Sequence, residues 1–146
     1  MSNVYVVYWS GTGNTQEMAM AIADGAKENG AEVTVWNVDE ADIEELKKAK
    51  ALALGCPSMG AEQLEEASME PFMCDLDSQI NGKTIALFGS YGWGDGQWMK
   101  DWEDRIASDG ATVLNGEGII ANNEPSQEII YAVSYTHLTL PTIYSV

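Results

Sequence analysis

The chain has 146 residues, 45% of them apolar, which is enough for one domain with a single core. Its 23 acidic and 7 basic side chains give a formal net charge of -16, which disfavours binding to nucleic acid or to an anionic membrane surface. The two cysteines form no CxxC pair and no Cys/His metal cluster, and neither a signal peptide nor a membrane span is recognisable, so we expect a cytoplasmic protein.

Apolar runs alternate with helical patterns along the chain. The expected strands are residues 4–9, 32–37, 51–54, 83–90 and a last strand made of 111–114 and 118–122. The expected helices carry Met18, Ile22 and Ala26, then residues 43–48, about 64–80, then Trp98, Trp102 and Ile106, and finally a segment from Pro125 onward. This order predicts an α/β fold, a doubly wound three-layer sandwich with a five-stranded parallel sheet and helices on both faces. Its ligand is expected at the carboxyl ends of the strands.

The first glycine-rich loop has the features of a phosphate site. It comprises Ser10, Gly11, Thr12, Gly13, Asn14 and Thr15, between the first strand and the first helix. Glycines allow a tight turn, and N–H groups and hydroxyls then converge on the helix N-terminus. The loop lacks the lysine of a P-loop, and Gln16 replaces the third glycine of a dinucleotide motif. A neutral set of donors favours a single monophosphate, hence a mononucleotide; the alternative is a polar turn that only caps the helix.

Two further loops follow strands three and four and should meet the first at one sheet edge. They are residues 56–62, with Met59, and residues 89–96, with Trp93. Because glycines flank Trp93, its indole would be exposed unless a flat ligand stacks against it. Met59 and Trp93 could cover the two faces of a planar ring. The alternative is that Trp93 packs on its own loop and Met59 fills a gap.

Residues 7–15, 59–60, 64–66, 70–72 and 88–96 together resemble the short-chain flavodoxins of anaerobic, clostridial bacteria, over about residues 3–132. The resemblance implies a flavodoxin-like sheet with strand order 2-1-3-4-5. It also implies a low-potential one-electron carrier that binds FMN non-covalently, cycles it through oxidised, semiquinone and hydroquinone forms, and has no substrate turnover of its own.

The same resemblance assigns roles in the FMN site. Ser10, Thr12, Asn14, Thr15 and Ser90 would hold the phosphate, Met59 and Trp93 would cover the inner and outer flavin faces, and Glu62 would bind the N3 edge. The other expected contacts are the loop residues Gly11, Gly13, Ser58, Gly60, Ala61, Tyr91, Gly92, Gly94 and Asp95. The Gly60 carbonyl would turn toward N5–H when one electron enters. Because Ala61 stands where relatives carry a small polar or acidic residue, we expect an altered semiquinone stability.

The expected partners are redox proteins with basic surfaces, such as reductases and low-potential oxidoreductases. The chain itself is expected to be a monomer. Neither a catalytic residue nor a metal site is expected, because His137, the sole histidine, lies far from the glycine loops. One alternative is an FMN-dependent quinone reductase of the same fold. Another is a phosphoacceptor signalling domain, which Trp9-Ser10 and Cys56-Pro57 disfavour because acidic residues are missing there.

The end of the chain departs from a helical pattern. After residue 133 come β-branched residues and Pro141, which disfavour a helix. We therefore expect an FMN-binding domain at residues 1–133 and an atypical, non-native tail at residues 134–146.

Overall fold

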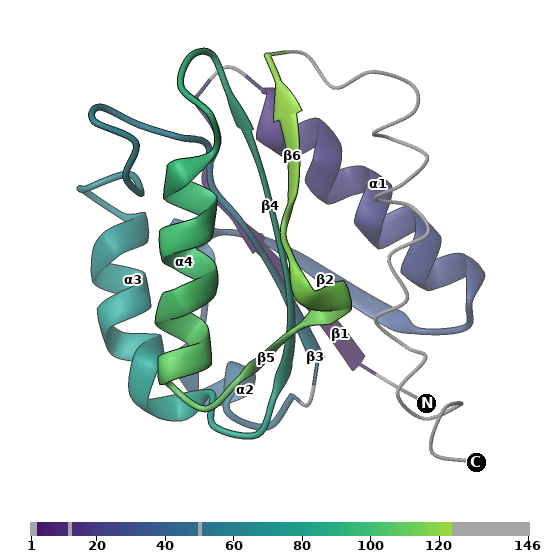
Figure 1. Cartoon of the computed structure of the whole chain (residues 1–146). Helices are drawn as coiled ribbons and strands as arrows, with labels where there is room; N and C mark the ends of the chain where they lie inside the picture. The colour runs from purple at the N-terminus through teal and green to yellow at the C-terminus, as the bar shows by residue number, and fades with distance from the viewer. Residues whose placement is uncertain (1–2, 12, 50, 124–146) are drawn as a thin grey trace.

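The computed structural model describes residues 3–11, 13–49 and 51–123, which form a sheet with helices on both faces (Figure 1). The strands are β1 (Asn3–Tyr8), β2 (Glu32–Asn37), β3 (Ala51–Gly55), β4 (Thr84–Tyr91), β5 (Thr112–Val113) and β6 (Ile119–Asn122). The helices are α1 (Asn14–Glu28), α2 (Ile43–Leu46), α3 (Met69–Leu76) and α4 (Gln97–Ser108). Single 3-10 turns occur at η1 (Val38–Glu40), η2 (Asp77–Gln79) and η3 (Leu114–Gly116).

All described strand pairs are parallel, and the order β2-β1-β3-β4-β5 confirms the predicted topology. The last strand is divided: β5 pairs with the start of β4 and β6 with its end. The division occurs at η3, where Asn115 and Gly116 have positive φ angles of 63° and 83°. β5 and β6 lie within residues 111–114 and 118–122, the two stretches that the sequence predicts as one strand.

Two apolar layers form because β4 side chains alternate between the faces of the sheet. Ala86 and Phe88 pack with Met18 and Ile22 of α1. The intervening Ile85 and Leu87 point to the other face, where α3 and α4 pack. Strands that are apolar on both faces suit the interior of a parallel sheet. Parallel pairing of β3 with β1 and β4 places the carboxyl ends of all three strands at one edge.

The third helix is shorter than predicted. Instead of starting near residue 64, α3 begins at Met69, and η2 follows it. The carboxylate of Glu65 accepts hydrogen bonds from the N–H groups of Ala67, Ser68 and Met69, at 2.7 to 2.9 Å. Those bonds satisfy N–H groups just before and at the start of the helix and hold residues 64–68 as a loop.

Two predictions fall outside the described residues: the helix starting at Pro125 and the tail 134–146. Of the helices that the structure describes, none combines the length and apolarity needed to cross a bilayer.

Candidate functional site

Backbone hydrogen bonds join the three loops at the carboxyl edge of the sheet. The N–H of Trp9 donates to the Gly55 carbonyl at 3.0 Å, which links the end of β1 to the end of β3. The N–H of Ser58 donates to the Ser90 carbonyl at 2.9 Å, which links the second loop to the end of β4. The predicted convergence of the loops is therefore present.

The phosphate loop turns tightly into α1. Gly13 is the N-cap residue with φ 99°, and it has no side chain with which to cap the helix. Ser10 Oγ accepts the N–H groups of Gly13 at 3.1 Å and of Gln16 at 3.3 Å. Since these bonds use its lone pairs, the Ser10 hydroxyl proton can be donated outward to an anion. Thr12 lies outside the described residues.

Two buried hydroxyls lie together beside this helix start. Thr15 in the first turn of α1 is 1% exposed, and Ser90 near the end of β4 is 5% exposed. Their oxygens are 3.1 Å apart, and the Ser90 N–H donates to Thr15 Oγ1 at 3.3 Å. Buried hydroxyls at a helix N-terminus can form a neutral donor set for an anion, and the expected contact of these two with a phosphate stays a prediction.

The loop that carries Trp93 presents its indole to solvent. Trp93 is 64% exposed, and Gly92, Gly94 and Asp95 beside it are exposed too. The loop is nevertheless held at its base, because the Asn123 N–H donates to the Tyr91 carbonyl at 2.7 Å. An exposed indole on an anchored loop is a surface on which a flat ring can stack.

The base of that loop also packs on α4. The rings of Tyr91 and Trp98 are 5.6 Å apart between centroids, and Trp98 Nε1 donates to the Cys56 carbonyl at 3.0 Å. Trp98 is therefore buried core, whereas Trp93 is not. Because Trp93 is exposed, the alternative in which it packs on its own loop is wrong.

The second loop forms a closed turn. Met59 and Gln63 exchange backbone hydrogen bonds of 2.8 and 2.9 Å as an isolated antiparallel bridge. Gly60 and Ala61 at its tip are exposed, and Met59 is half-buried. Glu62 Oε1 accepts the Gln97 N–H at 2.9 Å, so this carboxylate contacts the start of α4. Its predicted contact with a flavin edge stays a prediction, as do the other individual FMN contacts.

Two ionisable groups near the loops, Cys56 and Glu65, have shifted pKa values. Burial raises the pKa of the Cys56 thiol to about 12, so this cysteine is no nucleophile at neutral pH. Burial also raises the pKa of Glu65, but its three backbone donors outweigh that effect and leave the pKa below its ordinary value. Among the described residues, no group of three or more His, Cys, Asp or Glu side chains could hold a metal ion.

Sequence reasoning missed three residues that shape the site: Glu65, Gln97 and Asn123. A glutamate that precedes three small or polar residues before an apolar helix was a usable signal for the first. The other two act through backbone N–H groups, which carry no residue-specific signal.

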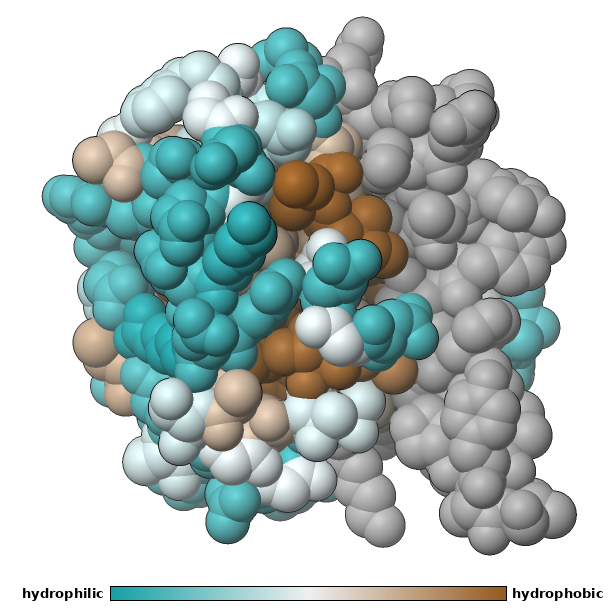
Figure 2. Space-filling model, viewed as in Figure 1, coloured by the Kyte–Doolittle hydropathy of each residue, from teal (hydrophilic) through white to brown (hydrophobic). Residues whose placement is uncertain are grey.

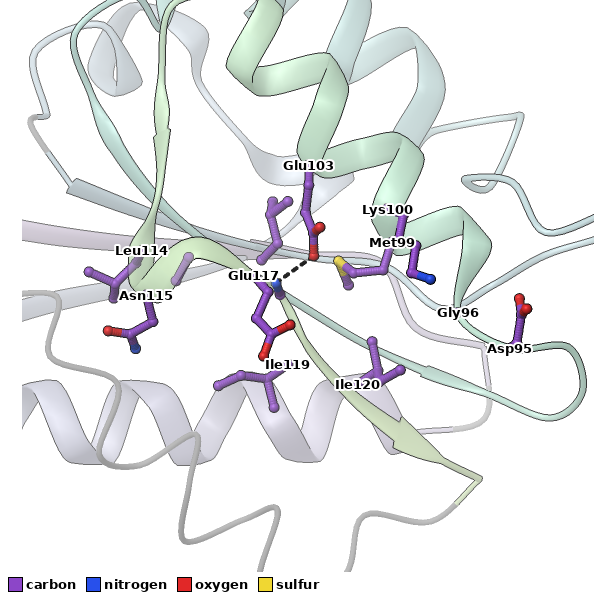
Figure 3. A pocket seen from close by; sticks show the side chains of 13 residues that line it. Asp95, Gly96, Met99, Lys100, Glu103, Leu114, Asn115, Glu117, Ile119 and Ile120 are labelled. Carbon is purple, nitrogen blue, oxygen red and sulfur yellow. Dashed lines mark hydrogen bonds between the residues drawn. The ribbon is translucent and has the colours of Figure 1, made fainter.

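A separate cavity of about 490 Å³ lies between α4 and β6 (Figure 3). Its lining includes Asp95 and Gly96 from the tryptophan loop, but neither Met59 nor Trp93. Figure 2 shows apolar residues gathered beside the hydrophilic surface of α4. The cavity adjoins the candidate site without containing the residues expected to cover a ring.

Comparison with known proteins agrees with this geometry. The family model described as flavodoxin matches residues 6–134. The chain belongs to the flavodoxin family. It is 49% identical to a flavodoxin of Clostridium beijerinckii over 122 residues, 84% of this chain and 88% of the relative. The structure of two-electron reduced Megasphaera elsdenii flavodoxin matches with a TM-score of 0.81 and 41% identity, over 90% of this chain and 98% of that one.

Flavodoxin family proteins bind FMN and carry electrons, and this chain is an FMN-binding electron carrier. The residues present suit FMN, because hydroxyls at a helix N-terminus can bind its phosphate and an exposed indole can stack on its ring. A quinone-type NAD(P)H dehydrogenase of Rhizobium rhizogenes is 48% identical, but over only 54 residues, 37% of this chain and 27% of the relative. The quinone reductase alternative therefore has only a partial match.

Proposed function

We propose that this chain accepts and donates electrons one at a time through FMN held in the three loops, without turning over a substrate itself. The proposal rests on Trp93, which is 64% exposed and lies at the same sheet edge as the buried hydroxyl pair of Thr15 and Ser90. One feature suits a ring and the other a phosphate. Only a ligand with both groups uses both features.

The phosphate is assigned to the loop at the start of α1. Ser10, Thr15 and Ser90 supply hydroxyls, and the first turn of α1 supplies N–H groups. The helix dipole adds a favourable field for an anion at this end. Thr12 and Asn14 complete the proposed set. No cationic side chain is needed, which suits one terminal phosphate rather than a polyphosphate.

The ring is assigned to the space between Met59 and Trp93, with Glu62 at its edge. FMN, when bound, supplies the redox chemistry. The chain holds the ring, limits water around it and sets the field that it experiences. Ala61 is exposed at the tip of the turn, beside Gly60 with φ 50°. Its effect on one-electron reduction stays a prediction.

Carboxylates around the loops should make reduction harder, because they disfavour added negative charge. Glu62, Glu66 and Asp95 lie on or next to the two ring-covering loops. One carboxylate about 10 Å from the ring would cost an added charge roughly 0.4 kcal/mol in water and about 1.7 kcal/mol at an effective dielectric near 20. Several such charges together favour a low potential.

The negative charge of the chain also determines which kind of partner surface it attracts. A net charge of -16 favours redox proteins with basic surfaces and raises the rate of encounter at low salt. It disfavours nucleic acid and anionic membranes. A monomeric state and a cytoplasmic location stay predictions.

Two assays separate this proposal from the quinone reductase alternative. The first titrates the purified apoprotein with FMN and follows the loss of flavin fluorescence; one FMN per chain is expected. The second supplies the FMN-loaded protein with a nicotinamide donor and a quinone; no turnover is expected. Sustained quinone reduction would refute the carrier assignment, and absent FMN binding would refute the site.

A further inference from the structure

The turn of residues 59–63 holds a non-glycine residue in a strained conformation. Glu62 has a positive φ of 54°, which side-chain-bearing residues rarely adopt. Gly60 in the same turn also has a positive φ, and the Met59–Gln63 bridge closes the turn around both. Strain at such a position persists only when its surroundings fix it.

The Glu62 carboxylate supplies that fixing contact by reaching the other ring-covering loop. It accepts the N–H of Gln97, the first residue of α4, at 2.9 Å. A Cβ built on Gly94 would lie 2.6 Å from the Glu62 carboxyl carbon and 2.8 Å from each oxygen. The carboxylate therefore lies directly on the backbone of the tryptophan loop, in a space that only glycine leaves open.

Electrostatics favour this contact. A carboxylate at the first turn of a helix is stabilised by the helix dipole and by the unpaired N–H groups there. Among the hydrogen bonds of the described residues, Glu62 Oε1 has a partner and Oε2 has none. One oxygen thus bonds the first residue of α4, while both oxygens lie against the backbone of the tryptophan loop.

We propose that Glu62 is a positioning residue that fixes the methionine turn against the tryptophan loop and α4 before the cofactor binds. Because these loops are the ones assigned to FMN, the role rests on the proposed function. It predicts that the two loops loosen together when the carboxylate is removed, even in the apoprotein. An ordinary helix cap would stabilise α4 alone and leave the methionine turn unchanged.

Amide hydrogen exchange of the apoprotein tests this directly, because no flavin contact contributes. A hydrogen bond to a charged group is strong enough that Glu62→Ala should speed exchange at Gln97 by at least about tenfold. Exchange at Gln63, inside the turn, should rise with it. Glu62→Gln keeps an acceptor oxygen and should restore most of the protection at both amides. Glu66→Ala, the neighbouring exposed carboxylate, is the matched control and should leave Gln97 unchanged.

A second pair of variants keeps the test independent of Glu62 itself. Gly94→Ala and Gly96→Ala share the strain of a positive φ, at 85° and 94°, but only the first places a methyl group on the Glu62 carboxylate. Gly94→Ala should therefore speed exchange at Gln63 and Gln97 more than Gly96→Ala does. That excess should vanish when each glycine change is made separately in the Glu62→Ala background and the two double variants are compared.

The outcomes are distinguishable from failure of the proposed function. Unchanged Gln97 exchange in Glu62→Ala, or faster Gln97 exchange with unchanged Gln63 exchange, would overturn the positioning role. An unchanged excess for Gly94→Ala in the Glu62→Ala background would also overturn it. Failure of the unaltered apoprotein to bind FMN would instead overturn the proposed function, whatever the exchange rates show.

Discussion

Thr15→Val removes one hydroxyl from the proposed phosphate site and keeps the shape of the side chain. Thr15 is 1% exposed, and its oxygen lies 3.1 Å from Ser90 Oγ while accepting the Ser90 N–H at 3.3 Å. Valine would leave both groups of Ser90 without this partner in a buried site. The variant therefore removes one phosphate donor and disturbs a second.

The expected size of the effect follows from these contacts. A hydrogen bond to a charged group contributes about 1.5–3 kcal/mol. Since about 1.4 kcal/mol corresponds to a tenfold change in Kd, the variant should bind FMN roughly 10- to 150-fold more weakly. Thr15→Ser keeps the hydroxyl and should bind FMN like the unaltered protein.

Riboflavin separates the phosphate contact from the ring contacts, because it lacks the phosphate. Each apoprotein is titrated with FMN and with riboflavin, with flavin fluorescence as the signal. Thr15→Val should weaken FMN binding and leave the riboflavin Kd unchanged. Equal losses for both ligands would show that the variant disturbs the fold, and an unchanged FMN Kd would refute the phosphate assignment.

Three further changes test other parts of the structure. Burial and the neighbouring Asp77 raise the pKa of Asp109 to about 6. The protonated Asp109 carboxyl therefore stabilises the fold fully below the ordinary Asp pKa, and this stabilisation is lost as the pH rises through about 6. Asp109→Asn should thus raise the free energy of unfolding in urea at pH 7 by about 1 kcal/mol after solvent screening, with no difference in acid; an equal gain at both pH values would contradict this. Gly55→Ala places a methyl group on the Phe88 ring and should cost about 1–3 kcal/mol, so an unchanged urea midpoint would count against the packing. Deleting residues 134–146 should leave FMN affinity and Tm unchanged, because the family-model match ends at the first residue of this tail; a marked loss of either would show that the tail belongs to the domain.

The sheet was predictable because its central strands, β3 and β4, are apolar on both faces and glycine-containing loops follow them. The pattern at residues 51–54 indicated a central strand, and the structure places β3 between β1 and β4. The start of α3 was not predictable from periodicity alone. The side chain of Glu65 bonds three N–H groups there, and that competition between loop and helix depends on burial of the carboxylate.

The candidate site was predictable in its loops but not in its connections. Glycines around Trp93 indicated an exposed indole, and the structure shows one. Glu62, in contrast, was assigned from a family resemblance to a ligand edge, and its bond to Gln97 required knowing where α4 begins. Contacts between a side chain and a distant backbone N–H depend on the assembled fold, so a sequence pattern does not reveal them.

In the proposed function, the three loops hold one FMN and let it take up electrons singly. Anaerobic stepwise reduction of the FMN-loaded protein, followed by visible absorption at controlled potential, measures this most directly. The structure predicts one FMN per chain and two resolved one-electron steps, the second at low potential because of the surrounding carboxylates. A single two-electron step, or FMN that does not stay bound at one per chain, would contradict the account.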